Sequence, residues 1–121
     1  MLEDSQIYII VDIELDGLMP GKNSMLSIGA VASTAAQEMG SFYKKALPLE
    51  DLSADPETME WWKTQPKAWQ EVNADAESAA TVIEAFREWV KSFGKTPVFV
   101  ASPLILNYPF IKRQRRFKSG I

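Results

Sequence analysis

Two chemically versatile residue types are missing from this chain of 121 residues, which contains neither cysteine nor histidine. Without cysteine there can be no disulfide bond, no thiol nucleophile and no cysteine-ligated zinc site. Without histidine, the chain lacks the side chain that most often acts as general base near neutral pH. Ser24 and Ser102 are therefore interpreted as loop or strand-end residues rather than as nucleophiles.

The chain also lacks a long apolar run and a large net charge. The N-terminus is acidic at Glu3 and Asp4, and Asp12 interrupts the first apolar stretch, which is typical of neither a signal peptide nor a membrane span. We expect a cytoplasmic protein. The formal net charge is −3, but five of the 13 basic residues fall within 112–118, which leaves eight basic and 16 acidic residues elsewhere. An acidic body with a basic end suits an enzyme that handles phosphates, although solvated helix faces have the same composition.

The length fits a single domain over residues 1–121, and its first half is rich in strand-like segments. Three apolar, β-branched or aromatic stretches with short turn-like connections predict an antiparallel meander. These stretches are 7–15, 25–32 and 41–47.

The second half is predicted to be mainly helical. The triplet DPE at 55–57 is a helix-start signal, with an N-cap carboxylate and a proline at the first helical position. Apolar residues at helical spacing and a closing glycine at position 94 indicate a longer helix further on. The expected helices are 56–66, a short turn over 67–72, and 75–94.

A fourth strand is expected over 97–101 (PVFVA). It follows a helical crossover and should therefore run parallel to an earlier strand. A last helix is expected over 103–118, with an irregularity near Pro109. This order of elements predicts an α/β domain with a mixed sheet.

Asp12 and Glu14 stand out on the first strand because they are two residues apart, so their side chains leave the same face. An acid pair within an apolar strand is costly unless its charge is compensated. A bound divalent cation would compensate it, since hard cations prefer clustered carboxylate oxygens. The pair taken alone is also compatible with a solvent-exposed strand end that holds no ligand.

The residues around this pair carry a family resemblance. VDIELDG, followed by NSMLSIGAVA, resembles the first exonuclease motif and second strand of the DEDD superfamily, which includes proofreading exonucleases and oligoribonuclease. DPETMEWWKTQP and VFVASPLILNYPF resemble a bacterial branch of it, the 3′-5′ exoribonuclease-like proteins. The resemblance runs over about 7–118 and corresponds to the N-terminal two-thirds of the family domain. It implies an RNase H-like fold.

The resemblance also implies a reaction and a set of site residues. The reaction is hydrolysis of the terminal phosphodiester at RNA 3′ ends, with two Mg²⁺ or Mn²⁺ ions about 3.5–4 Å apart. Asp12 would bridge both ions, and Glu14 would bind the ion that activates water. Leu15 and Gly17, in the loop after Glu14, would lie against the terminal nucleotide.

Half of the family's catalytic set is absent from the chain. Asn107 occupies the position of the third carboxylate, where an amide offers a neutral oxygen but no charge. The fourth carboxylate and the general-base histidine belong to an HxxxxD motif that the chain does not contain. We therefore expect weak binding of at most one ion, and weak or no hydrolysis by this polypeptide alone. A fragment of a longer enzyme, an engineered or naturally degenerate form, and a noncatalytic nucleic-acid- or protein-binding module all remain open.

Three further features bear on binding. Trp61 and Trp62 are adjacent on a helix and point about 100° apart, so one of them packs in the core, while the other can stack on a base or lie half-buried under a loop. The KRQRRFK cluster at 112–118 suits contacts with phosphates, a solvated helix face, or a face that meets a further C-terminal part. Without a further C-terminal helix, apolar surface should stay uncovered, and a symmetric homodimer would bury it.

Overall fold

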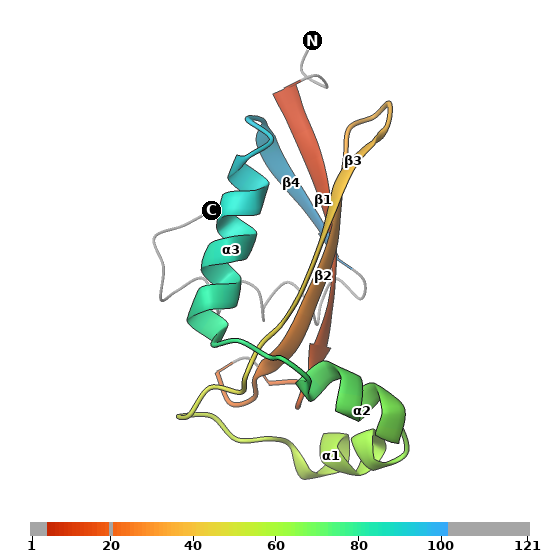
Figure 1. Ribbon diagram of the computed structural model, residues 1–121, viewed down its shortest axis with the longest axis vertical. Coiled ribbons are helices and arrows are strands. Elements are labelled where there is room, and N and C mark those ends of the chain that lie inside the picture. Colours follow the sequence, from red (N-terminus) through yellow and green to blue (C-terminus); the bar gives the residue numbers. More distant parts are fainter. Residues whose placement is uncertain (1–4, 20, 102–121) are drawn as a thin grey trace.

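The computed structural model describes residues 5–19 and 21–101 of the chain. Within these residues, three strands are followed by three helices and a fourth strand (Figure 1). The elements are β1 (Gln6–Leu15), β2 (Met25–Ser33), β3 (Glu38–Lys45), α1 (Pro56–Lys63), α2 (Pro66–Asn73), α3 (Ala79–Lys91) and β4 (Thr96–Ala101). The helix predicted over 103–118 lies outside the described residues.

The four described strands form one mixed sheet in the order β3-β2-β1-β4. β2 pairs antiparallel with both β1 and β3, whereas β4 runs parallel to β1. The parallel register places Gln6 opposite Thr96 and Val11 opposite Ala101. The predicted α/β class, the antiparallel meander and the parallel fourth strand are thus confirmed.

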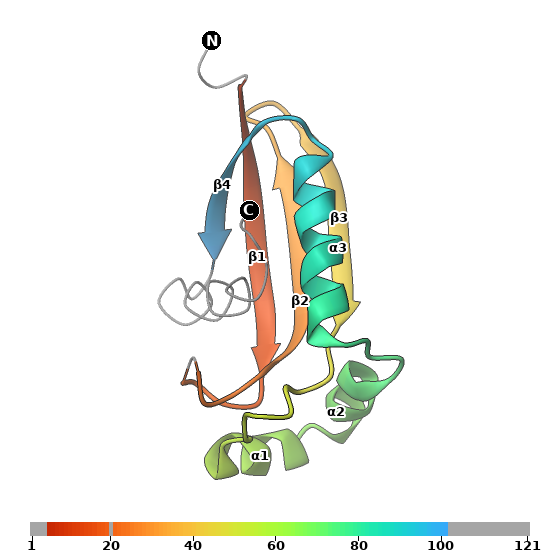
Figure 2. The ribbon, with the colours of Figure 1, turned by 90° about the vertical axis from the view of Figure 1, so that its left-hand side faces the viewer.

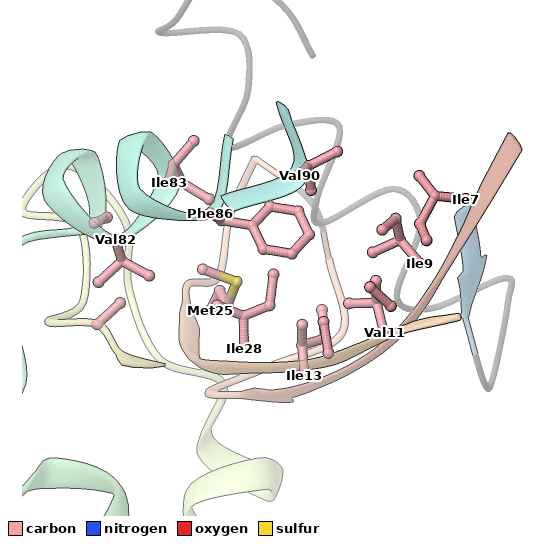
Figure 3. Packing of buried hydrophobic residues seen from close by; sticks show 14 residues of the cluster. Ile7, Ile9, Val11, Ile13, Met25, Ile28, Val82, Ile83, Phe86 and Val90 are labelled. Carbon is pink, nitrogen blue, oxygen red and sulfur yellow. The ribbon is translucent and has the colours of Figure 1, made fainter. Parts of the chain in front are cut away.

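The main core lies between α3 and one face of the sheet (Figure 2). Alternate residues of β1 point toward α3, as the side-chain period of two requires. Figure 3 shows the Phe86 ring of α3 above these strand residues. Burial of a large apolar side chain contributes roughly 1.5–3 kcal/mol, so this face is the main source of stability. The buried residues of this cluster are Ile7, Ile9, Val11, Ile13, Met25, Ile28, Ala30, Ala32, Ala46, Ala79, Val82, Ile83, Phe86 and Val90.

Side-chain caps mark the starts of α1 and α3. The Asp55 carboxylate accepts a hydrogen bond from the Thr58 amide at 2.9 Å, so the predicted start of α1 is confirmed. The predicted start of the long helix at Asp75 was wrong. Asp75 adopts a left-handed conformation with φ of 57°, and the N-cap of α3 is Ser78, whose hydroxyl accepts from the Thr81 amide.

A tertiary contact explains the later start of α3. Glu77 is held in extended conformation beside the end of β3, because its amide donates to the Lys45 carbonyl and its carbonyl accepts from the Leu47 amide. A helix cannot begin until the chain has left this bridge. At its other end, α3 stops at Lys91, and Gly94 takes a left-handed φ of 62° as predicted for the closing glycine.

The helices α1 and α2 lie at the end of the sheet where β1 finishes (Figure 2). They enclose a second, smaller core in which Trp62 and Val72 pack with Leu26 of β2, flanked by Met59 and Trp69. In the described part of the chain, none of the helices has the length and apolar character needed to cross a membrane.

Candidate active site

Asp12 and Glu14 lie on the face of the sheet that points away from α3, which we call the open face. They alternate along β1 with the buried residues Val11 and Ile13, and both acids are exposed. The structure therefore places the two carboxylates on one face, as their spacing predicted. The register assigns to the open face Tyr8, Ile10, Asp12 and Glu14 of β1, Gly29 and Val31 of β2, Ser41 and Tyr43 of β3, and Val98 and Val100 of β4.

The ionised form of Glu14 is penalised at its position beside Asp12. Partial burial raises the pKa of Glu14 above its usual value of 4.5, and repulsion from the Asp12 carboxylate raises it further. A raised carboxyl pKa means that the ionised form is penalised, and a nearby positive charge relieves that penalty. Two carboxylates can hold one Mg²⁺ or Mn²⁺ that keeps several waters. Within 5–19 and 21–101, no group of three or more acidic, histidine or cysteine residues is placed to hold a metal.

A shallow groove of about 600 Å³ crosses the open face beside Asp12. Gly29 forms part of its floor and stands in register between Asp12 and Tyr43. A Cβ added to Gly29 would lie 3.6 Å from the Tyr43 ring, which is an ordinary contact. The absence of a side chain at Gly29 therefore adds to the depth of the groove. Ile10 and Val31 line the same groove. Asp12 therefore borders a mainly apolar groove.

Buried polar contacts fix the loop that follows Glu14. Asp16 is 3% exposed, and its amide donates to the Ser24 carbonyl at 3.0 Å while its carboxylate accepts from the Ser24 amide. Burial raises the pKa of Asp16, and the hydrogen bond from Ser24 acts against that rise. Asn23 is 2% exposed, accepts from the Met19 amide at 2.9 Å and donates to the Ser53 carbonyl at 2.7 Å.

Gly17 lies directly against the Asn23 side chain, and a Cβ at position 17 would overlap it. Gly17 was singled out in the sequence, whereas Asn23 was missed. The available signal was its place in the turn GKNS before β2, since asparagine is common in turns. That signal does not reveal which groups the side chain binds.

The two adjacent tryptophans of α1 have different surroundings. Trp62 is 3% exposed, and its indole Nε1 donates to the Leu15 carbonyl at 2.9 Å. Trp61 is 51% exposed and lies edge-on against Trp62, with ring centroids 4.9 Å apart. The structure thus brings α1 to the residue that directly follows Glu14, and it leaves one indole ring open to solvent.

Two predicted features fall outside the described residues: Asn107 and the basic cluster at 112–118. Their distances from Asp12 and Glu14 therefore stay predictions. The described part of the site consists of the acid pair, the loop after it and α1.

The match to a known domain family covers most of this architecture. Residues 7–105 match the 3′-5′ exoribonuclease Rv2179c-like domain. The chain belongs to this family. The matched range begins in β1, contains the acid pair and both tryptophans of α1, and extends past the end of β4. The resemblance to 3′-5′ exoribonuclease-like proteins is thereby confirmed.

A curated relative is described as a 3′-5′ exonuclease. The chain is 32% identical over 114 residues to the 3′-5′ DNA exonuclease Cap18 of Escherichia coli. This alignment covers 92% of the chain and 58% of Cap18, so the chain spans little more than half of that relative's length.

Solved structures of exonuclease I share the fold. A product-bound structure of exonuclease I has a TM-score of 0.72 at 13% identity, over 93% of this chain and 25% of that one. The metal-free form of the E. coli ExoI–ssDNA complex has a TM-score of 0.67 at 16% identity, over 92% and 24% of the two chains. At these identities the likeness concerns the fold alone, and it confirms the RNase H-like α/β architecture.

Proposed function

We propose that this chain is a metal-dependent 3′-5′ exonuclease domain that removes nucleotides from RNA 3′ ends, with weak or no turnover as this polypeptide alone. The observation that carries the proposal is the pair of exposed carboxylates, Asp12 and Glu14, on the open face of an exonuclease-family fold. Family membership supports the reaction class. The substrate, the metal and the roles of the residues are proposed from the site.

In the proposed site, Asp12 and Glu14 are the carboxylate ligands, and Asn107 contributes an amide oxygen. When bound, Mg²⁺ or Mn²⁺ supplies positive charge that lowers the pKa of a bound water and stabilises the leaving oxygen. The raised pKa of Glu14 supports this role, because a cation relieves the penalty on its ionised form. The two carboxylates carry two negative charges and the amide adds none, which balances one divalent ion but not two, so we expect one weakly bound ion.

This ligand set makes a prediction about Asn107. Asn107→Asp adds a negative charge where the family has a carboxylate, and it should tighten Mn²⁺ binding in a calorimetric titration. Hydrolysis should stay slow, because the general base and the fourth carboxylate are still missing. An unchanged affinity in Asn107→Asp would mean that this residue is not a ligand.

The terminal nucleotide would lie at the end of β1, against Leu15 and Gly17. Trp61 offers an exposed indole for stacking on the base, a contact worth roughly 1–3 kcal/mol. Trp62 is buried and would not touch the base; it supports this region through its hydrogen bond to the Leu15 carbonyl. For Trp61→Ala, the loss of binding free energy for the nucleotide should therefore exceed the loss of unfolding free energy.

RNA is the proposed substrate because the family is described as exoribonuclease. Single-stranded DNA is the comparison to make, since Cap18 is described as a DNA exonuclease and exonuclease I was solved with ssDNA. We place this activity in the cytoplasm. The basic cluster at 112–118 is proposed to contact phosphates of the strand.

The test is a nuclease assay on 5′-labelled single strands of RNA and of DNA, with Mn²⁺ or Mg²⁺. We expect slow, cation-dependent shortening from the 3′ end, faster on RNA, that disappears with Asp12→Ala or a chelator. Glu38→Ala removes an exposed acid at the start of β3 and is the matched control. Shortening that persists in Asp12→Ala, or a chain that neither shortens strands nor binds Mn²⁺, would contradict the proposal.

The second candidate function is a noncatalytic module that self-associates. The open face favours it, because Ile10, Val100 and Tyr43 are 48%, 44% and 55% exposed there. Ile10 stands in register between Val100 and Val31, which gives a continuous apolar row across three strands. A second copy of the chain would cover this row in a twofold dimer. Sedimentation should then show a dimer that Ile10→Asp dissociates; a monomer at every concentration would rule it out.

A further inference from the structure

We propose that Trp62 is a positioning residue for the acid pair, because its indole hydrogen bond to Leu15 couples α1 to the strand end that carries Glu14. This inference rests on the proposed function, since it concerns how that site is held in place. It assigns to α1 a task beyond packing: fixing the carboxylates relative to the exposed ring of Trp61.

The bond from Trp62 lies where the β-ladder becomes irregular. Glu14 pairs with Ser27 of β2, but the next residue, Leu15, pairs with Met25, so one residue of β2 is skipped. At this point the Leu15 carbonyl accepts from the Trp62 indole at 2.9 Å. A backbone carbonyl in such a place needs a partner, and here the partner comes from a residue 47 positions away.

A second bond joins the same strand end to the cap of α1. The Asp16 carbonyl accepts from the amide of Asp55, the N-cap residue, at 2.7 Å. The carbonyls of the two residues that follow Glu14 are thus both bound by α1 or its cap. The position of this strand end is therefore set by α1 as well as by the sheet.

The Trp62 ring is itself firmly held. It is 3% exposed and packs with Leu26 and Val72, with the Trp69 ring centroid 5.2 Å away. A close-packed side chain of this size cannot shift without repacking its neighbours. Trp61 packs edge-on against the same ring, with the two ring centroids 4.9 Å apart. One rigid indole thus contacts both the exposed stacking ring and the strand end with the carboxylates.

Trp62 and Trp69 share one aromatic cluster, but Trp62 is buried whereas Trp69 is partly buried, so the shape-preserving variant of Trp62 is the one that separates its hydrogen bond from its packing. The hydrogen bond to Leu15 belongs to Trp62 only. Three variants separate the two roles. Trp62→Phe keeps an aromatic ring without the donor. Replacement of Trp62 by 3-benzothienylalanine keeps the shape of the indole and replaces the N–H by sulfur, and Trp69→Phe is the matched control.

The experiment measures three properties of each variant: the thermal unfolding midpoint, the Mn²⁺ dissociation constant by calorimetry, and backbone ¹⁵N relaxation at residues 14–16. For both Trp62 variants we expect the Mn²⁺ dissociation constant to rise about three- to tenfold, the range that corresponds to one hydrogen bond. We also expect larger backbone motion at Leu15 and Asp16. Trp69→Phe should leave both properties near those of the parent, even where its unfolding midpoint falls.

Each possible result supports or overturns the positioning role of Trp62. Equal losses of affinity in the Trp62 and Trp69 variants, or no loss in any, would overturn the positioning role. If Trp62→Phe does not fold, the benzothienyl variant gives the answer. If the parent itself binds no Mn²⁺, the proposed metal site fails, and relaxation alone decides whether Trp62 holds the strand end. Unchanged motion at 14–16 would then overturn this inference as well.

Discussion

The two faces of one sheet are put to different uses. Toward α3, β1 presents Ile7, Ile9 and Val11, which are at most 1% exposed. Toward the open face, the same strand presents Ile10 and the acid pair, all exposed. Because successive side chains of a strand alternate between faces, stability and chemistry are carried by neighbouring residues of one strand. Changes on the open face should therefore affect the site with little loss of stability.

The largest expected effect tests the closed face. Phe86 is 1% exposed, and its ring centroid lies 5.4 Å from that of Phe42 and 6.4 Å from that of Phe99. Phe86→Ala should lower the free energy of unfolding by about 3–5 kcal/mol, the usual cost of removing a buried aromatic ring. Tyr43→Ala on the open face should cost less than about 1 kcal/mol, because Tyr43 is 55% exposed. Denaturant unfolding measures both, and similar losses would remove the distinction between the faces.

A smaller loss of stability is expected in the loop that follows Glu14. Gly17→Ala would push the Asn23 side chain away and break its bonds to Met19 and Ser53. Leaving such groups unpaired costs about 1–3 kcal/mol. Gly29→Ala is the matched control, since its Cβ would meet only ordinary contacts, and it should change the unfolding free energy by less than about 0.5 kcal/mol. A neutral Gly17→Ala would show that the loop does not depend on this contact.

The smallest effect on stability is expected at Glu14, and it has the opposite sign. The folded-state pKa of Glu14 lies above the usual 4.5 because of partial burial and the Asp12 charge. The folded chain therefore binds this proton more tightly than the unfolded chain does, and stability falls as the pH rises from 4.5 through the raised pKa. Glu14→Gln should remove that fall, so the variant should be slightly more stable than the parent at pH 7.

Unfolding midpoints measured across this pH range for the parent and Glu14→Gln test the prediction. The variant should also lose Mn²⁺ binding, so that stability and binding change in opposite directions. A variant less stable than the parent at neutral pH would indicate that the Glu14 carboxylate makes favourable contacts in the fold.

Local patterns in the sequence were sufficient for much of the fold. The alternation in β1 predicted the shared face of Asp12 and Glu14, and the triplet at 55–57 predicted the start of α1. The start of α3 was missed, because the bridge between Glu77 and the end of β3 joins segments about thirty residues apart in sequence and no local signal marks it.

The site was less predictable for the same physical reason. Asn23 binds Ser53, 30 residues away, and Trp62 binds Leu15, 47 residues away. Helical geometry indicated that Trp61 and Trp62 point in different directions, but not which of them faces the core. Long-range hydrogen bonds of this kind depend on how elements pack, and a single sequence does not encode them locally.

The most direct test of the open face as a functional site is a calorimetric titration of the parent chain and of Asp12→Asn with Mn²⁺. Glu38→Gln serves as a control for an exposed acid outside the open-face pair. We predict one weak site in the parent and in Glu38→Gln, and no binding in Asp12→Asn, whose unfolding midpoint should stay near that of the parent. Binding that Asp12→Asn leaves unchanged would contradict the assignment of the acid pair as the metal site.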